Sequence, residues 1–368
     1  MSYIGILYLG KKGGPTVDTL EMCKALVNEN HLYIVISTKI ENLEEYKKLQ
    51  IGNPERVKIL TVNTYESKIG FMIKSLNIFR FIYISNKIKK EKCDFIYLPM
   101  LTYWGAFLSI FLKREKIITA IHDPESHIGE KNFLFEKLTK ICVNKSSNLV
   151  VFSKKFISLV SERYSFPIEK IFNLKLGGYS YYKKNLNLRE KYNSRFNKIL
   201  FFGRISKYKG LSILLEAVKK MRECGSNITL KVVGNGILST EEKKLIAELG
   251  EGVELINRWI KDEEVESFFD NIDFTVLPYI EATQSGVIML SYAMCKAVLV
   301  TNVGALSEQV FEDTGLIVEP NNVDALIKGI NDLYEHNSFI EKGKKGNYYS
   351  TYEWTWEKQA QKLVEFMS

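Results

Sequence analysis

The sequence is poor in cysteine and histidine, with five and four residues of each type among 368. The cysteines (Cys23, Cys93, Cys142, Cys224 and Cys295) are scattered, with no C-x-x-C pair and no zinc-like spacing to the histidines. These absences argue against a disulfide framework and a zinc motif, and they predict a reduced, cytoplasmic protein.

Long apolar runs, internal repeats and low-complexity tracts are also absent. No apolar stretch reaches the roughly 18 residues of a membrane-spanning helix, so we expect none. The apolar run at 3–9 has no basic segment before it and no small-residue cleavage site after it. We therefore expect a first strand there rather than a signal peptide.

Composition and charge indicate an ordinary globular protein with two unlike halves. Hydrophobic residues make up 46% and charged residues 26% of the chain, and its length suggests about two domains. Residues 1–190 hold 30 Lys and Arg against 18 Asp and Glu, a net charge of +12, whereas residues 191–368 hold 21 against 25, a net charge of −4. A basic half indicates an anionic partner, and without a nucleic-acid-binding motif we expect no nucleic acid.

Short apolar runs alternate with amphipathic segments such as 209–224 and 322–335. This alternation predicts an α/β fold in which helices cover both faces of parallel, doubly wound sheets. We expect strands at 3–9, 32–37, 95–100, 117–122, 148–153, 198–203, 228–234, 253–256, 273–278, 297–301 and 314–318.

The strand series restarts after a polar stretch at 179–197, which predicts an interdomain connection. We expect two Rossmann-like domains, 1–185 and 186–350, that face a central cleft where ligands of such sheets bind. Residues 351–368 have helical spacing. They are expected to cross back to the N-terminal domain, or alternatively to dock on their own domain.

Two motifs follow predicted strands of the N-terminal half. Gly13 and Gly14 form a turn whose backbone N–H groups could bind a phosphate, although a plain tight turn explains them too. The segment HDPESHIGE at 122–130 begins with His122 and Asp123, where active-site groups of open α/β sheets sit. Its alternatives are a helix start capped by Asp123 or Ser126, or a metal site.

Two further motifs lie in the C-terminal half. Gly203, Arg204 and Lys209 connect a strand to a helix, and cations at a helix N-terminus are easier to explain if an anion joins them. A polar loop with Thr283, Ser285 and Gly286 follows another strand and could either cradle a phosphate or cap the next helix.

Five segments then occur in a familiar order: GRISKYKG at 203–210, VVGNG at 232–236, NRWIKDEEV at 257–265, LPYIEATQSGV at 277–287 and KAVLVTNVGALSE at 296–308. In this order the chain resembles the retaining GT-B glycosyltransferases of the large group 1 (family 4) type, which includes sugar transferases for capsule and lipopolysaccharide, in a variant with TQSGV. The resemblance covers most of 198–368. In the N-terminal half it depends on the Gly-Gly turn and HDPESHIGE.

The resemblance implies transfer of a hexose-type sugar from a nucleoside-diphosphate sugar to a glycan or lipid-linked acceptor, with retention and with no cofactor or metal. Arg204 and Lys209 would bind the diphosphate, and His122 would lie near the transferred sugar with Asp123 beside it. The residues implied for donor binding are Gly13, Gly14, Gly203, Asn235, Arg258, Trp259, Glu281, Thr283, Gln284, Ser285, Gly286 and Glu308. No Asp-x-Asp pair occurs that would hold a divalent ion.

One position departs from the family pattern. Many members carry two glutamates separated by seven residues, the second of which contacts the ribose, but Met289 stands eight residues after Glu281. Ribose recognition must therefore differ. This departure leaves two alternatives open, a non-catalytic GT-B-like partner subunit and a sugar-nucleotide epimerase.

Basic and aromatic residues alternate at 68–92 and 103–116. Such segments could lie on an anionic membrane, here the inner face of the plasma membrane, and would suit a lipid-linked acceptor. The alternative is a pair of core helices with solvated basic faces.

Overall fold

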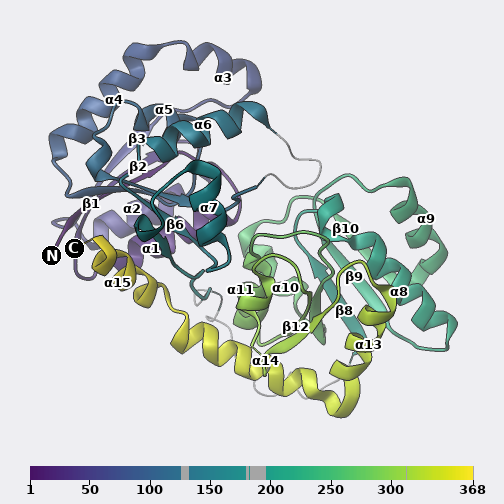
Figure 1. Ribbon diagram of the computed structural model, residues 1–368. Helices are drawn as coiled ribbons and strands as arrows, with labels where there is room; N and C mark the ends of the chain where they lie inside the picture. The colour runs from purple at the N-terminus through teal and green to yellow at the C-terminus, as the bar shows by residue number, and fades with distance from the viewer. Residues whose placement is uncertain (126–131, 180–181, 183–195, 312, 368) are drawn as a thin grey trace. The chain divides into compact units, whose positions relative to one another are not determined.

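The computed structural model describes residues 1–125, 132–179, 182, 196–311 and 313–367 (Figure 1). The described residues form two compact units: the first contains those up to Leu176 together with 356–367, and the second contains 177–355. The predicted boundary at 185/186 lies outside the described residues and stays a prediction.

Within its described residues, the first unit contains a parallel seven-stranded sheet in the order β3-β2-β1-β4-β5-β6-β7. Its strands are β1 (Tyr3–Tyr8), β2 (His31–Ser37), β3 (Val57–Val62), β4 (Phe95–Leu98), β5 (Ile117–Ile121), β6 (Asn148–Val151) and β7 (Ile171–Asn173). Its helices are α1 (Gly14–Leu26), α2 (Leu43–Gly52), α3 (Lys68–Ser75), α4 (Ile78–Glu91), α5 (Tyr103–Ser109), α6 (Phe133–Asn144), α7 (Phe156–Tyr164) and α15 (Trp356–Met367).

Helices cover both faces of this sheet, as the alternation of side chains along β4 shows. Ile96 and Leu98 belong to one apolar core together with Trp104 of α5. Tyr97, between them, points to the opposite face and lines a pocket with Trp356, the first residue of α15. Successive side chains of a strand alternate between faces, so β4 is buried on both.

The second unit contains a parallel six-stranded sheet in the order β10-β9-β8-β11-β12-β13, counted over its described residues. Its strands are β8 (Lys198–Phe202), β9 (Thr229–Gly234), β10 (Val253–Asn257), β11 (Phe274–Leu277), β12 (Ala297–Thr301) and β13 (Gly315–Val318). Its helices are α8 (Leu211–Glu223), α9 (Thr240–Leu249), α10 (Val265–Phe268), α11 (Gly286–Ala293), α12 (Leu306–Gln309), α13 (Val323–Tyr334) and α14 (Ser338–Tyr348).

The predicted fold class is confirmed, and each expected strand has its counterpart within two residues at either end. The sequence reading missed β3 and β7, which are the two outermost strands of the first sheet. An outer strand has one neighbour and more solvent contact, so β3 is buried only at its two ends and includes polar residues between them, unlike the continuous apolar runs of the central strands.

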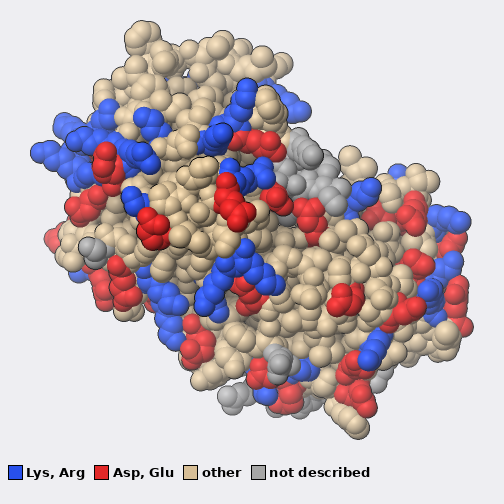
Figure 2. Space-filling view, in the orientation of Figure 1, with Lys and Arg blue, Asp and Glu red and all other residues tan. Residues whose placement is uncertain are grey.

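The segment at 103–116 proves to be a core element, because α5 buries Trp104, Ala106 and Leu108. Over the first unit, Lys and Arg outnumber Asp and Glu around α4 on the face shown in Figure 2. In the described part of the chain, every helix is too short or too polar to span a bilayer.

Candidate active site

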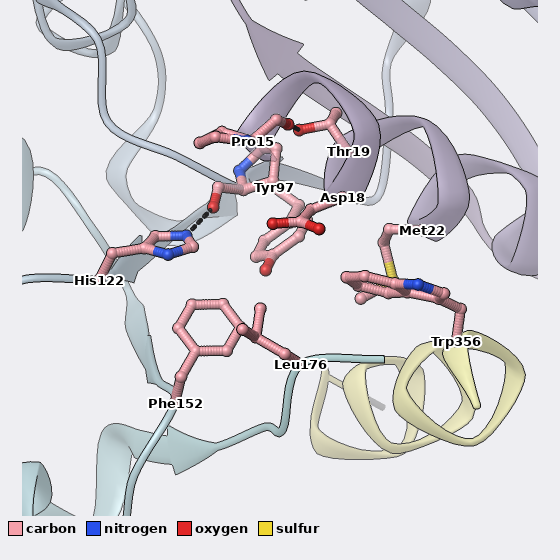
Figure 3. A pocket seen from close by; sticks show the side chains of 10 residues that line it. Pro15, Asp18, Thr19, Met22, Tyr97, His122, Phe152, Leu176 and Trp356 are labelled. Atoms are coloured by element: carbon pink, nitrogen blue, oxygen red, sulfur yellow. Dashed lines mark hydrogen bonds between the residues drawn. The ribbon is translucent and has the colours of Figure 1, made fainter. Parts of the chain in front are cut away.

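A pocket in the first unit lies at the carboxyl ends of adjacent strands (Figure 3). The order β1-β4-β5-β6 brings together Pro15 of α1, which follows β1, with Pro99 after β4, His122 after β5 and Phe152 after β6. Open α/β sheets bind their ligands at this edge, so the predicted His122 occupies an expected place.

The His122 ring is half-buried and held on two sides. Its Nε2 lies 2.7 Å from the carbonyl oxygen of Pro99, and its ring packs 4.3 Å from that of Phe152. A carbonyl can only accept a hydrogen bond, so Nε2 carries the proton and Nδ1 is the accepting nitrogen of the neutral ring. Burial lowers the pKa of His122, while the bond to Pro99 and the neighbouring Asp123 oppose this shift.

The lowered pKa of His122 predicts a loss of stability in acid. The folded protein holds the ring neutral, whereas the unfolded chain takes up a proton as the pH falls below about 6.5. Below that pH the unfolded state binds more protons and the free energy of unfolding decreases. We expect the Tm to fall less between pH 7 and pH 5.5 in His122→Gln than in the wild type. Equal slopes in the two proteins would show that His122 does not contribute.

The remainder of the HDPESHIGE motif is only partly described. Residues 126–131, including Ser126, lie outside the described residues. The next helix, α6, begins at Phe133, and the side chain of Asn132 caps it by accepting from the Phe135 N–H at 3.0 Å. The alternative in which Asp123 or Ser126 caps this helix is therefore wrong.

Gly13 and Gly14 lie at the start of α1, as predicted. The Gly13 N–H donates to the Glu41 carboxylate at 2.7 Å, and the Thr16 hydroxyl donates to the same oxygen at 3.0 Å. A phosphate that used the Gly13 amide would therefore have to displace Glu41, which the sequence reading missed. Gly14 faces open space.

In the second unit, the predicted donor residues follow the carboxyl ends of neighbouring strands. Gly203 and Arg204 follow β8, Asn235 follows β9, Arg258 follows β10, and the 281–286 loop follows β11. The sheet order β10-β9-β8-β11-β12 places these ends along one edge. Parallel topology thus gathers segments that are far apart in the sequence.

Lys209 is the most buried cation of this edge, at 8% exposure. Its Nζ lies 4.9 Å from the centre of the Tyr279 ring and only 3.0 Å from the place where a Cβ on Gly203 would stand. Gly203 has φ +109°, so this close approach requires glycine. Among the described residues no carboxylate forms an ion pair with Lys209, and a buried ammonium without one is a natural partner for an anion.

Arg204 lies on the same turn but is exposed to solvent. Its Nη2 donates to the Tyr208 hydroxyl at 3.1 Å. The backbone carbonyl of Tyr208 accepts from Ile280 at 2.7 Å and from Glu281 at 3.4 Å. The turn at 203–209, which we call the cationic turn, is thereby joined to the loop after β11, which carries the half-buried Glu281.

Ser285 and Gly286 form the start of α11. The Ser285 hydroxyl caps the helix by accepting from Val287 N–H, and the Tyr279 hydroxyl lies 3.3 Å from it. The two readings of this loop, helix cap and phosphate cradle, are compatible. The same Val287 lies 3.5 Å from a Cβ placed on Gly203, so the first turn of α11 is adjacent to the Lys209 ammonium.

Gln309 is a site residue that the sequence reading missed, although it directly follows the predicted Glu308. Its Oε1 accepts from the Ser285 N–H at 2.8 Å, and its Nε2 donates to the Ser285 carbonyl at 3.2 Å. One buried amide thus fixes both backbone groups of the residue that begins α11. Glu308 itself lies half-buried on α12 beside it.

Gln309→Ala is expected to lower kcat/KM for sugar transfer about 10-fold and to reduce the free energy of unfolding by about 1–3 kcal/mol, because two buried backbone groups lose their partner. Gln309→Glu keeps the acceptor for the Ser285 N–H and should retain more activity than the alanine variant. Equal activity in wild type and Gln309→Ala would exclude this positioning role.

Arg258 and Trp259 are exposed after β10. The Arg258 guanidinium forms a two-pronged ion pair with Glu264, at 2.5 and 3.0 Å, which lowers the pKa of Glu264 to about 2. The Arg258 charge is therefore paired with Glu264 rather than directed at the turn that carries Arg204 and Lys209.

Asn235, after β9, contacts that turn through its backbone. Its carbonyl accepts from the Ile205 N–H at 2.9 Å, which connects the loop after β9 to the turn.

Thr283 and Gln284 lie in the loop before α11. The Thr283 carbonyl accepts from Ala305 at 3.2 Å, which connects this loop to the one after β12. Met289, where many family members have a ribose-binding glutamate, is fully buried in α11. The side chain at that position therefore packs in the interior of the second unit, and the expected change in ribose recognition stays a prediction.

Comparison with known proteins supports the expected family. Residues 196–336 match the family described as glycosyl transferases group 1. A lipopolysaccharide 1,2-N-acetylglucosaminetransferase of Salmonella typhimurium is 32% identical over 205 residues, which are 50% of this chain and 53% of that protein. The chain thus matches about half the length of that relative.

Two further similarities extend over the whole chain. An uncharacterised glycosyltransferase of Methanocaldococcus jannaschii is 25% identical over 96% of this chain and 93% of its own length. The crystal structure of Anabaena HepE in complex with UDP and glucose superposes with a TM-score of 0.70 at 15% identity, covering 99% of this chain and 98% of that one. Residues 196–336 therefore match the group 1 glycosyl transferase family, and the fold of the chain is that of two-domain GT-B glycosyltransferases.

Proposed function

We propose that this protein is a retaining, metal-independent hexosyltransferase that moves a sugar from a nucleoside-diphosphate sugar to a glycan or lipid-linked acceptor in the cytoplasm. The observation that carries the proposal is the buried ammonium of Lys209 between Gly203, the Tyr279 ring and the first turn of α11. A diphosphate supplies the negative charge that this arrangement lacks.

Sugar transfer requires the protein to stabilise a leaving group. As the acceptor oxygen bonds to the anomeric carbon, the bond from that carbon to the diphosphate oxygen breaks and negative charge grows on the diphosphate. Lys209, Arg204 and the N–H groups at the start of α11 are placed to receive that charge. In attack from the same face, the proton of the acceptor hydroxyl passes to the leaving phosphate oxygen, so no metal-bound base is required.

The first unit is proposed to bind the acceptor and the transferred sugar. The neutral His122 ring, with Nε2–H committed to Pro99, is proposed to lie beside the transferred sugar. Asp123 lies next to it in the chain. A histidine held neutral by burial at physiological pH suits this role better than a cation would, because it adds no charge beside the leaving diphosphate.

Two of the similar proteins favour the same class of reaction. The Salmonella relative is named for transfer of N-acetylglucosamine to lipopolysaccharide, and the Anabaena neighbour was crystallised with UDP and glucose. These names support surface-polysaccharide synthesis and a uridine nucleotide donor as the first substrates to test.

The proposal is tested by incubating the protein with UDP- and GDP-sugars, with and without a membrane extract, in parallel reactions with and without EDTA. We expect nucleoside diphosphate to be released with one donor, faster with the extract, and a product with the donor's anomeric configuration. Rates that vanish with EDTA would contradict metal independence, and inversion would contradict retention.

A non-catalytic partner subunit remains the second candidate, favoured by the buried Met289 at the usual ribose position. It predicts no turnover with any donor in the same assay. An epimerase would instead convert the nucleotide sugar to its epimer without an acceptor.

A further inference from the structure

The two helices α3 and α4 of the first unit carry large apolar side chains on their outer surface. Seven large apolar residues of the two helices and the link between them are more than half exposed, and we call them the α3–α4 surface: Ile69, Met72, Ile73, Leu76, Ile78, Phe79 and Tyr83. Leu76 and Phe79 are 85% and 79% exposed. A surface helix normally turns a polar face to water, so this apolar face indicates a partner.

The inner sides of both helices are already occupied. Phe71 of α3 packs against Tyr65 at 4.8 Å, and Phe81 of α4 packs against Trp104 at 5.2 Å. Ile84 and Ile88 of α4 are buried in the core of the same unit. These contacts account for one apolar face of each helix and leave the α3–α4 surface unexplained by folding.

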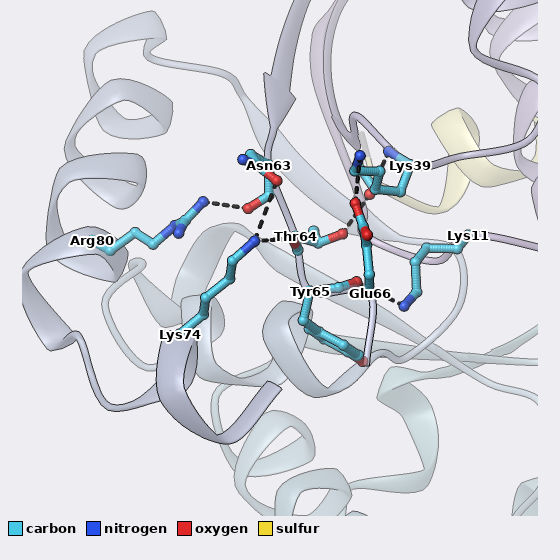
Figure 4. A network of polar contacts seen from close by, with 9 residues as sticks. Lys11, Lys39, Asn63, Thr64, Tyr65, Glu66, Lys74 and Arg80 are labelled. Atoms are coloured by element: carbon cyan, nitrogen blue, oxygen red, sulfur yellow. Dashed lines mark hydrogen bonds and ion pairs between the residues drawn. The ribbon is translucent and has the colours of Figure 1, made fainter. Parts of the chain in front are cut away.

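Cations hold the two helices in this orientation (Figure 4). Lys74 of α3 donates to the Thr64 carbonyl at 2.8 Å, and Arg80 of α4 donates to the Asn63 carbonyl. The Arg80 guanidinium also lies 5.0 Å from the Trp104 ring. These contacts fix the orientation in which the apolar side chains face outward. Both cations bind neutral carbonyl oxygens in them, so these contacts do not cancel their positive charge.

The charge around the α3–α4 surface is almost entirely positive. Residues 68–92 contain six lysines and one arginine but a single acidic residue, Glu91. In Figure 2 the end of the first unit formed by α3 and α4 is largely free of charged side chains and is bordered by blue ones. An apolar centre with a lysine border is complementary to an anionic lipid surface, in which acyl chains lie beneath charged headgroups.

We propose that the α3–α4 surface docks the protein on an anionic membrane, with Ile73, Leu76 and Phe79 inserted among the lipids and the lysines at the headgroups. Lysine is depleted in protein–protein interfaces, so a border made mainly of lysine favours lipid over a protein partner. The helices have 8 and 14 residues, too few to cross a bilayer, and would lie along its surface. This inference does not depend on the proposed reaction.

Vesicle co-sedimentation of the full chain tests the proposal. We expect binding to vesicles of phosphatidylcholine with 30% phosphatidylglycerol, and at least about 10-fold weaker binding to phosphatidylcholine alone. Ile73→Ser/Phe79→Ser should weaken binding to the anionic vesicles at least about 10-fold. Ile51→Ser, which alters an isoleucine 78% exposed on α2 of the same unit, should bind like the wild type.

Charge is tested separately from insertion. Lys89→Gln/Lys90→Gln on α4 should weaken binding about 10-fold at low salt, whereas Lys47→Gln/Lys48→Gln on α2 removes the same charge and should change it little. Unchanged Tm values establish that the variants fold. The proposal is overturned by an absence of binding at low salt, by equal loss in the control pairs, or by a dimer in sedimentation velocity that Ile73→Ser/Phe79→Ser dissociates.

Discussion

Lys209→Ala is expected to lower kcat/KM for sugar transfer by at least about 100-fold, the size of effect seen when one preorganised donor to a developing negative charge is removed. The ammonium is buried, lies beside Gly203 and the start of α11, and has no carboxylate partner among the described residues. A point charge so placed acts strongly on a diphosphate, because little solvent screens it.

Lys207→Ala is the matched control for this variant. Lys207 belongs to the same short turn, Lys207–Lys209, but its side chain is exposed. Lys207→Ala should therefore keep near-normal kcat/KM. Arg204→Ala should lower kcat/KM as Lys209→Ala does, because the Arg204 side chain is exposed but hydrogen-bonded to Tyr208 of the same turn. Near-normal transfer by Lys209→Ala, or an equal loss in Lys207→Ala, would remove the diphosphate assignment.

Gly304→Ala is expected to lower the free energy of unfolding by at least about 3 kcal/mol. Gly304 has φ +50°, and a Cβ there would stand 1.6 Å from the Ala282 carbonyl oxygen. Both the left-handed backbone and the collision oppose any side chain, and the collision forces apart the loop that carries Thr283 and the loop between β12 and α12. Activity should fall together with stability, since these loops adjoin α11.

Gly225→Ala separates the two causes. Gly225 also has positive φ, +88°, but a Cβ there would meet no atom within 4 Å. It should cost only about 1–2 kcal/mol, the penalty for a left-handed residue with a side chain. Urea unfolding followed by tryptophan fluorescence measures both variants. Equal destabilisation would mean that the close approach at Gly304 does not matter.

The sequence predicts much of the fold because the central strands are buried on both faces. Runs such as 117–121 and 297–301 are mostly apolar and buried throughout, and polar residues follow them in the turns. In parallel sheets those turns share one edge, so the sequence alone predicts that His122, Arg204 and Ser285 follow the carboxyl ends of strands, where ligands of such sheets bind.

What the sequence did not reveal depends on contacts between distant residues. Glu41 reaches Gly13 across 28 positions, and Gln309 reaches Ser285 across 24, and no local pattern encodes either contact. The exposure of the apolar outer face of α3 also cannot be predicted from the local sequence. Periodicity shows that residues 68–75 are amphipathic, but only packing shows that none of them is buried.

The most direct test of the account is the binding of nucleoside diphosphate to the full chain, measured by calorimetric titration with UDP and with GDP. The account predicts a Kd between about 1 μM and 1 mM for at least one of them, the usual range for enzyme substrates. It also predicts at least about 10-fold weaker binding to Lys209→Ala and unchanged binding to Lys207→Ala. If neither nucleotide binds the wild type, or if Lys209→Ala binds as tightly, the central claim is contradicted.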